Sequence, residues 1–463
     1  MIVYGDSMRT WTLAEFRALT DPLSKLIAAG EVAQALADAR GSHYPALDDL
    51  LLRGVECDLP ASIEVKEPEG YAFYAVDPQL YADAAHSVRD LANEWTVVGI
   101  RSIGTSLGAV VASALPNARF VTVRPTGHPF ARELRPSPYE ESVLRAGRGF
   151  YAIVDEGPGL SGSSFACVAS WLEQHGVTRD RIVFFPSHEG EPGAMASDDT
   201  RVLWHTTRRV HVPFELPRGV EDMSAGKWRA AVHRWPGVHV QQERRKYRDG
   251  ELLVKFEGFG LRGDEMFERA SQLAAFTPPV ISIDRGFIVS QWVDAKRGDL
   301  FDAVVRYLTF REKHWPAPKR GASARALAEM AAFNARVDLE PFVDEVDDDA
   351  QPIVTDNKLH AWEWLGTLKT DAIDHHASHD LVGCQDLGWD LAGAIIELGF
   401  EEERLLRAMQ TSTGRTWSRN VMHFYKSAYR AFWYGYYMLA EQSCVEEAPR
   451  LRREAQRYRI VSS

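Results

Sequence analysis

The chain has 463 residues, of which 45% are hydrophobic and 25% are charged, and its formal net charge is −12. A chain of this length exceeds one ordinary hydrophobic core, so about two or three domains are expected. The negative charge argues against a nucleic-acid partner, and no apolar run reaches the about 18 residues that a membrane span requires. The start of the chain lacks the basic and apolar segments of a secretory signal, and the four cysteines have no paired spacing. We therefore expect a cytoplasmic protein with small-molecule partners, and self-association into a homodimer is left open.

Strand and helix patterns alternate over residues 1–205. Apolar residues at helical spacing predict an N-terminal helical extension over 13–36 and a further helix over 78–95. Apolar runs of strand length then occur at 96–100, 120–123, 150–154 and 181–185. Strands that are buried on both faces read as continuous apolar runs, so this pattern predicts an α/β domain with a parallel sheet. Residues 206–236 lose the rhythm and are predicted to form a connection.

A turn rich in glycine and serine follows the strand at 150–154. Asp155 and Glu156 end the strand, and the run Ser161, Gly162, Ser163, Ser164 leads into the next helix. Backbone amides at a helix N-terminus bind anions, and serine hydroxyls add donors to phosphate oxygens. The two carboxylates suit hydroxyl groups beside that phosphate, so a sugar phosphate would satisfy both features. The alternative is a plain strand–turn–helix connection in which glycine only permits a tight turn.

Residues 70–205 resemble the type I phosphoribosyltransferases in this turn and in a second loop at 99–106. The resemblance implies that Asp155 and Glu156 hold the ribose hydroxyls of phosphoribosyl pyrophosphate (PRPP) at the catalytic centre. The serine turn would bind the 5′-phosphate, and Arg101 and Ser102 would bind the pyrophosphate together with Mg²⁺. The loop at 124–135 would form a flap over the site. The family's second glycine is replaced here by serine, in the middle of the predicted phosphate turn.

The pattern changes from residue 237 to residue 463. Strand patterns at 238–248 and 251–256 flank Asp249–Gly250, which is a strong hairpin signal. A helix over 264–276 and a strand over 286–292 follow, and the rest is mostly helical. Strands followed by helices predict an α+β domain with a small sheet lobe and a larger helical lobe.

This second region resembles the aminoglycoside- and choline-kinase-like branch of the protein-kinase fold over residues 238–440. The resemblance rests on a strand lysine and a series of acids in order: Lys255, Glu265 or Glu268, Asp356, Asp371 and Asp390. A strand lysine that is held by a helix glutamate can bind the α- and β-phosphates of ATP.

The resemblance implies a role for each of these residues, with ATP as substrate and Mg²⁺ as cofactor. Lys255 and Glu268 would bind ATP, and Asp356 would be the catalytic base that accepts a hydroxyl proton. Asp371 would hold Mg²⁺, and the cluster of acids and histidines around it adds Asp374 as a second candidate ligand. The acid at position 390, Asp390, would brace the catalytic loop.

Three departures separate this region from the family's pattern. No glycine-rich loop precedes Lys255, the residue after Asp371 is alanine, and Ala361 stands where the family has a metal-binding asparagine. His360 or Glu363 is the candidate replacement for that asparagine as a metal ligand.

Several residues have a second interpretation. The histidines and aspartates of 371–380 suit either an independent Zn²⁺ or Mn²⁺ site or a polar loop that caps the following helix. Lys255 has the alternative of being an exposed strand lysine. The aromatic residues of 424–437 predict a packed helix core, or else the wall of a pocket for a planar or cationic substrate.

Together the two regions predict a bifunctional transferase, with a phosphoribosyltransferase-like domain followed by a small-molecule-kinase-like domain. It would act on a ribosyl or nucleoside-type metabolite with PRPP, ATP and Mg²⁺. A PRPP- and nucleotide-sensing regulator is the alternative, and the missing glycine-rich loop and Ala361 favour it. A third hypothesis keeps only the front domain active and makes the rear domain a scaffold.

Overall fold

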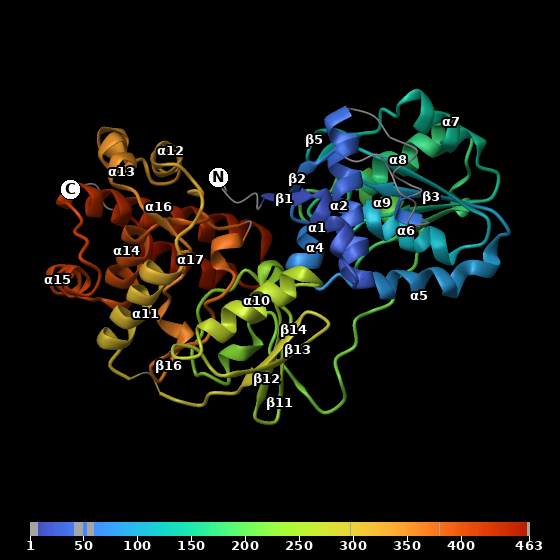
Figure 1. The fold of residues 1–463 in the computed structure, drawn as a ribbon. Helices are drawn as coiled ribbons and strands as arrows, with labels where there is room; N and C mark the ends of the chain where they lie inside the picture. The colour runs from blue at the N-terminus through green and yellow to red at the C-terminus, as the bar shows by residue number, and fades with distance from the viewer. Residues whose placement is uncertain (1–7, 41–49, 53–59, 297, 379, 461–463) are drawn as a thin grey trace. The chain divides into compact units, whose positions relative to one another are not determined.

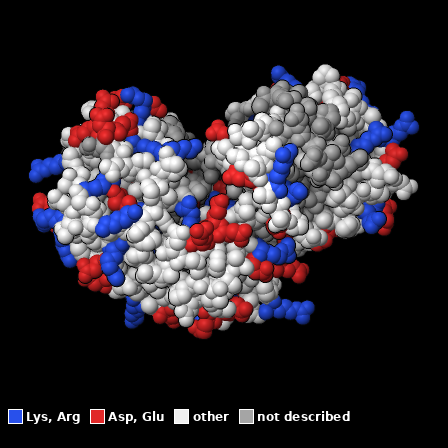
Figure 2. All heavy atoms as spheres, in the orientation of Figure 1, with Lys and Arg blue, Asp and Glu red and all other residues white. Residues whose placement is uncertain are grey.

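The computed structural model describes residues 8–40, 50–52, 60–296, 298–378 and 380–460. These residues divide into two compact units, which Figure 1 colours from blue to green and from green to red. The first unit comprises 8–216 with 259–261, and the second comprises 217–258 and 262–460. Over this described part, no helix is both long enough and apolar enough to cross a bilayer. Side chains of both charges are interspersed on the face shown in Figure 2.

Five parallel strands form the centre of the first unit. They are β3 (Trp95–Ile100), β4 (Ala118–Val123), β7 (Phe150–Val154), β8 (Ile182–Phe185) and β9 (Arg208–Arg209). Their order across the sheet is β4-β3-β7-β8-β9, and every pairing is parallel. The predicted α/β domain with a parallel sheet is confirmed. All six residues of β3 are buried, as expected for a central strand that is covered on both faces.

Helices cover both faces of this sheet. On one face, Val98 and Ile100 share a core cluster with residues of α7 (Pro138–Ala146), α8 (Ser163–Gln174) and α9 (Asp198–Thr206). Gly99 points the opposite way because side chains alternate along a strand, and there it meets α6 (Gly104–Ala114). A Cβ on Gly108 of α6 would lie 3.0 Å from the Cα of Gly99. The two glycines therefore allow α6 to pack directly against β3.

The N-terminal extension contains α1 (Leu13–Ala18) and α2 (Pro22–Arg40) in place of the single helix predicted over 13–36. Thr12 caps α1 in a capping box with Glu15, and Pro22 starts α2. The strands β1 (Met8–Thr12) and β2 (Ser62–Lys66) pair antiparallel beside these helices. Three further helical segments complete the extension: α4 (Glu69–Ala72), α5 (Pro78–Val88) and the short η1 (Arg89–Leu91).

The second unit begins with an antiparallel sheet, as the sequence pattern predicted. Its strands are β10 (Glu221–Asp222), β11 (Lys246–Asp249), β12 (Leu252–Phe256), β13 (Val280–Asp284) and β14 (Phe287–Gln291), in the order β10-β11-β12-β14-β13. The helix α10 (Leu261–Gln272) lies between β12 and β13 in the chain. The hairpin at Asp249–Gly250 joins β11 to β12, and Gly250 has a positive φ of 56° that suits glycine.

Helices form the larger part of the second unit. They are α11 (Phe301–His314), α12 (Ala324–Ala335), α13 (Val343–Asp349), α14 (Leu387–Leu398), α15 (Glu402–Thr413), α16 (Arg419–Ser443) and α17 (Ala448–Tyr458). Two short antiparallel pairs interrupt them between α13 and α14: β15 (Pro352–Ile353) with β18 (Gln385–Asp386), and β16 (Trp364–Leu365) with β17 (Leu368–Lys369). The aromatic residues of α16 pack in the core, as predicted, with Tyr429 and Trp433 fully buried.

The segment 206–236, predicted as a connection, contributes one edge strand to each sheet. Its strand β9 pairs with β8 in the first unit, and β10 pairs with β11 in the second. Both strands have only two residues, which is too short for an alternating or continuous apolar pattern to be visible in the sequence.

Trp389→Ala tests the packing of the helical part. Trp389 on α14 is fully buried, and its ring lies 5.3 Å from Tyr429 and 6.0 Å from Phe432. Loss of this side chain leaves a cavity, so the free energy of unfolding of the second unit should fall by about 3–5 kcal/mol. Urea unfolding followed by circular dichroism measures the change. The exposed Phe333 on α12 offers a control, because Phe333→Ala should stay within about 0.5 kcal/mol of the parent. Equal midpoints for the two variants would contradict this packing.

Candidate functional site

The sheet of the first unit has a switch point between β3 and β7. From β3 the chain continues to β4 on one side, and from β7 it continues to β8 on the other. In open α/β sheets, ligands bind outside the carboxyl ends of the strands at such a point. Arg101 and Ser102 follow β3, and Asp155 and Glu156 follow β7. The topology therefore brings both predicted loops to the same edge of the sheet.

Asp155 and Glu156 are two half-buried acids at this edge. No cation in the described ranges pairs with either carboxylate. Burial raises the pKa of Asp155 to about 7, and burial together with the charge of Asp155 raises the pKa of Glu156 to about 8. The backbone is close here, since a Cβ on Gly70 would lie 2.8 Å from Oε2 of Glu156. Two acids without a protein cation suit a ligand that donates hydroxyl hydrogens.

The serine turn contacts a small hairpin that lies within the predicted flap. Its strands are β5 (Thr126–His128) and β6 (Ala131–Glu133), and its tip includes Pro129. The hydroxyls of Ser161 and Ser163 lie 3.2 and 3.0 Å from the carbonyl oxygen of Pro129, and 2.9 Å from each other. Gly162 has a positive φ of 63° and caps α8. A phosphate at this turn would take the place of the Pro129 carbonyl, and phosphate binding by Ser161 to Ser164 stays a prediction.

Arg101 is used inside the first unit. Its guanidinium is buried and pairs with Glu140 on α7 at 2.6 Å, and its Nε donates to the Thr122 hydroxyl at 3.2 Å. A role at pyrophosphate would require this pair to open, so that role stays a prediction. Ser102 lies exposed on the same loop.

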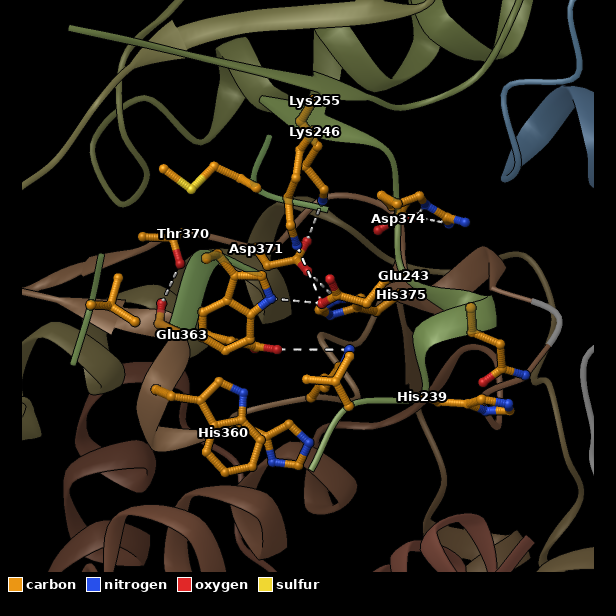
Figure 3. Close-up of a pocket in the computed structure, with 18 of the residues that line it drawn as sticks. His239, Glu243, Lys246, Lys255, His360, Glu363, Thr370, Asp371, Asp374 and His375 are labelled. Atoms are coloured by element: carbon orange, nitrogen blue, oxygen red, sulfur yellow. Dashed lines mark hydrogen bonds and ion pairs between the residues drawn. The ribbon is translucent and has the colours of Figure 1, made fainter. Parts of the chain in front are cut away.

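A cavity of about 190 Å³ lies between the sheet and the helical part of the second unit. Figure 3 shows Lys246 and Lys255 entering it from the strands β11 and β12, opposite Asp371 and His375. The other walls come from the loop that carries Glu363 and from aromatic side chains of α16. The α16 residues in this wall are Trp433, Tyr436 and Tyr437. The aromatic stretch thus fills the core, as predicted, and also lines a cavity, whereas a planar or cationic substrate for that cavity stays a prediction.

Lys255 is buried and bound by two acids. Its Nζ lies 2.8 Å from Oδ1 of Asp371 and 2.8 Å from Oε1 of Glu257. Burial lowers the pKa of Lys255, but the charges of Asp371 and Glu257 outweigh burial and raise it above the usual value. This corrects the alternative of an exposed strand lysine.

The predicted partner Glu268 is also corrected. It lies on the exposed side of α10, where its carboxylate accepts from Gln272. Glu257, two residues after Lys255, takes the partner role instead. The signal was present in the sequence, because residues i and i+2 of an extended segment point to the same side.

Asp371 divides its two carboxylate oxygens between different neighbours. Oδ1 accepts from Lys255, and Oδ2 lies 3.4 Å from Nε2 of His375. Burial raises the pKa of Asp371, but Lys255 and His375 more than offset this and hold it well below its usual value. The carboxylate is therefore ionised at neutral pH.

Glu363 is the third member of a candidate metal site with Asp371 and His375. One ligand atom from each residue lies within 4.8 Å of the others. Of the two candidates for the missing asparagine, the structure thus brings Glu363 to the cluster, whereas His360 lies fully buried against Trp362 at 4.3 Å and Glu397 at 3.4 Å.

Asp374 has another partner. Its carboxylate binds the guanidinium of Arg244, with Nε at 3.2 Å, and this pair holds the pKa of Asp374 well below its usual range against the effect of burial. Asp374 lines the same cavity, and its predicted metal role stays a prediction that would require this pair to open.

Asp356 is fully buried, and the cavity wall does not include it. Its carboxylate accepts from the hydroxyl of Tyr307 and lies 3.5 Å from Nζ of Lys369 and 3.7 Å from Arg311. Burial raises its pKa, but Lys369 and the hydrogen bond from His375 outweigh this and bring the pKa well below the usual range. A base must reach the proton that it accepts and must have a pKa near the working pH. Asp356 meets neither condition in this arrangement, and its role as catalytic base stays a prediction.

His375 links Asp356 to the candidate metal site. Its Nδ1 lies 2.9 Å from the Asp356 carbonyl oxygen and 3.3 Å from Oδ1 of the same residue. Burial disfavours the charged ring, but Asp371 and Asp356 raise the pKa of His375 to about 9. The two carboxylates that attract a proton to this ring would also attract a divalent cation.

Asp390 lies in the first turn of α14 and holds the loop that contains Asp356. Its carboxylate oxygens accept from the backbone amides of Asp356 at 2.8 Å and Asn357 at 2.9 Å. Burial and the charge of Asp356 raise the pKa of Asp390 to about 7. These are the contacts expected of a residue that braces the loop.

The segment between β10 and β11 lies where a glycine-rich loop was expected and not found. It lines the cavity with Trp228, His239 and Glu243. Arg229 in this segment donates two hydrogen bonds, of 2.7 and 2.9 Å, to the carboxylate of Glu447 at the start of α17. Bulky and charged side chains thus form this wall.

No family model matches the chain, and no curated protein matches it. Solved structures of small-molecule phosphotransferases align with about half of it. Choline kinase LicA from Streptococcus pneumoniae is 12% identical over 47% of this chain and 90% of that chain, with a TM-score of 0.34. Macrolide 2'-phosphotransferase MphH from Brachybacterium faecium is 14% identical over 54% and 95%, with a TM-score of 0.31. Aminoglycoside 2'-phosphotransferase-IIIa is 12% identical over 52% and 93%, with a TM-score of 0.30.

Similarity at this level assigns neither a family nor an activity. The function is therefore inferred from the contacts of the two sites.

The raised pKa values of Asp155 and Glu156 predict a pH-dependent stability of the first unit. The folded chain binds more protons than the unfolded chain between about pH 4 and pH 8. The stabilising contribution is complete below the unfolded pKa values and is lost as the pH rises through the folded ones. Calorimetry should thus show a lower Tm at high pH, and Glu156→Gln should flatten this dependence. Asp83→Asn, at an exposed carboxylate of α5, should leave it unchanged. Identical pH profiles for the parent and Glu156→Gln would refute the assignment.

Proposed function

We propose that the second unit binds a nucleoside triphosphate together with a divalent cation and transfers a phosphoryl group to a small hydroxylated compound. The observation that carries this proposal is the direct contact of Lys255 with Asp371, inside a cavity that also contains Glu363 and His375. In nucleotide-dependent phosphotransferases, a lysine contacts the phosphates directly, and a nearby acid binds the divalent cation that contacts the same phosphates. Lys255 and Asp371 would perform these two tasks.

Lys255 would contact phosphate oxygens through an ammonium group that stays charged inside the cavity. Because water is largely excluded, its interaction with phosphate charge is stronger than at the surface. Glu363, Asp371 and His375 would hold the cation, which when bound neutralises charge on the phosphate oxygens. The aromatic wall of Trp433 and its α16 neighbours suits a planar or hydroxylated acceptor.

The burial of Asp356 does not prevent phosphoryl transfer. In the loose transition state of this reaction, the bond to the attacking oxygen is weak, and catalysis comes mainly from positioning and charge. The chain's own part is then to align the nucleotide through Lys255 and to exclude water.

A nucleotide-binding regulator is the second candidate for this unit. It is favoured by the absence of Asp356 from the cavity wall and by the bulky segment that stands in place of a glycine-rich loop. Such a protein would bind the nucleotide through the same lysine and acids without turnover.

Asp371→Asn separates these functions from a purely structural role. Removal of the charge should lower phosphoryl transfer from labelled ATP to small hydroxylated compounds by more than about 100-fold, as for other residues that stabilise transition-state charge. Lys313→Met, at an exposed lysine of α11, is the control and should keep full activity. ATP binding without turnover by the parent chain would select the regulator, and absence of both would contradict the proposal.

We further propose that the first unit binds a ribosyl phosphate of the PRPP type. The support is the pair of acids at the switch point, for which no described cation is a partner, next to a serine turn at the start of α8. Ribose hydroxyls would donate to Asp155 and Glu156, and the phosphate would replace the Pro129 carbonyl at Ser161 and Ser163. If both units turn over their ligands, the chain is a bifunctional enzyme of ribosyl or nucleoside-type metabolites.

Titration calorimetry with PRPP tests this second site. Binding should strengthen between pH 6 and pH 8.5, because ionised carboxylates accept better than protonated ones and the two pKa values are about 7 and about 8. Glu156→Gln and Asp155→Asn should each weaken binding by about tenfold or more, the loss expected for a charged hydrogen-bond acceptor. Asp83→Asn should have no effect. Undiminished affinity in both site variants would place PRPP elsewhere or nowhere on this unit.

A further inference from the structure

We propose that Glu363, Asp371 and His375 form a site for a transition-metal divalent cation of the Mn²⁺ class in preference to Mg²⁺, and that Asp356 is the residue that positions His375 in it. This inference deepens the function proposed for the second unit, because the cation would lie beside the phosphates that Lys255 contacts. It gives Asp356 a defined positioning task.

The three ligands converge from three separate turns of the loop between α13 and α14. Glu363 ends the 3₁₀ turn η6 (Ala361–Glu363), Asp371 follows β17, and His375 begins the 3₁₀ turn η7 (His375–Ala377). One ligand atom from each lies within 4.8 Å of the others. A single ion can therefore contact all three with small side-chain adjustments.

His375 has a ring nitrogen without a hydrogen-bond partner. Its side chain is only 6% exposed, and Nε2 is buried with no such partner among the described atoms. The nearby Oδ2 of Asp371, at 3.4 Å, lacks hydrogen-bond geometry and is itself a ligand candidate. Nε2 thus faces only this carboxylate oxygen, and a cation bound between the two atoms would contact both.

Asp356 fixes the orientation of that ring. Two of its oxygens face Nδ1 of His375, the carbonyl at 2.9 Å and Oδ1 at 3.3 Å. A histidine that binds a metal typically donates its other N–H to a carboxylate or a backbone carbonyl, which leaves the remaining nitrogen as the ligand. Asp390 holds the backbone of Asp356 in turn, so the orientation is fixed by a continuous chain of contacts.

The other two ligands are each held by a lysine. Asp371 accepts from Lys255 through Oδ1, and its Oδ2 faces His375. Glu363 accepts from Lys369 through Oε2 at 2.6 Å, and its Oε1 forms a longer ion pair with Lys358 at 3.8 Å. The lysines thereby hold the carboxylates in place, and the longer Lys358 pair would open for Oε1 to bind a cation.

The imidazole ligand selects the class of metal. Mg²⁺ is bound in proteins by oxygen ligands and water, whereas an imidazole with carboxylates is typical of transition metals. Mn²⁺ accepts this mixed set and also binds phosphate oxygens. Mn²⁺ is therefore the probe of choice.

Pulsed electron paramagnetic resonance of the full chain loaded with Mn²⁺ tests the inference. The parent chain should show nitrogen hyperfine coupling from His375 in the absence of nucleotide, and it should bind Mn²⁺ at least about tenfold more tightly than Mg²⁺. His375→Gln should remove the coupling. His376→Gln changes the neighbouring residue of the same turn, outside the cluster, and should preserve it.

Asp356→Asn tests the positioning role. It should weaken Mn²⁺ binding by about 10–100-fold, as loss of a group that orients a metal ligand does elsewhere, and should alter the nitrogen coupling constant. Nucleotide binding without metal should persist in this variant, which separates misplacement of His375 from a general loosening of the unit.

A parent spectrum without nitrogen coupling at saturating Mn²⁺, or a coupling that survives in His375→Gln, overturns the inference. The parent spectrum decides even if the variants do not fold. Phosphoryl transfer with Mg²⁺ but no nitrogen-coupled Mn²⁺ would refute this metal site and leave the proposed function standing. Nitrogen-coupled Mn²⁺ without any phosphoryl transfer would support the metal site and refute the proposed phosphotransferase function.

Discussion

The second unit depends on the way in which one buried carboxylate, that of Asp371, is shared. One oxygen holds Lys255 at 2.8 Å, and the other faces His375 at 3.4 Å. Burial alone would favour a neutral acid, but the cations around it are close enough to keep it charged. This charge fixes the lysine of the sheet against the loop of the helical part. The same charge would make the cavity able to accept both a polyphosphate and a cation, so the proposed function and the proposed metal site rest on it together.

The rest of the loop is arranged to hold this carboxylate and its neighbours still. Asp390 binds two backbone amides at Asp356, and Asp356 in turn contacts the ring of His375. At the switch point of the first unit, Asp155 and Glu156 are adjacent, and none of the cations described by the structure pairs with them. Their high pKa values mark a place where ionisation is costly until a ligand supplies hydrogen-bond donors. In each unit, the shifted pKa values of the acids and their neighbouring charges are the features that indicate a ligand.

Local patterns in the sequence were sufficient to predict the two kinds of sheet, the hairpin at Asp249–Gly250 and the positions of the loops that carry the acids. These features depend on short-range periodicity and turn chemistry, which one sequence displays. The partners of individual side chains were not predictable in the same way. Glu140 on α7 binds Arg101, which follows β3, because such a choice depends on how separate elements pack. The burial of Asp356 is of this kind, since it follows from Tyr307 and Lys369, which are distant in the chain or offer no pattern of their own.

Anomalous diffraction at the manganese edge is the most direct test of the shared carboxylate. Crystals of the full chain grown with Mn²⁺ and a non-hydrolysable ATP analogue should show one strong peak among Glu363, Asp371 and His375, with Lys255 contacting both Asp371 and a phosphate oxygen. A peak at another place, or density for the analogue outside this cavity, would contradict the account.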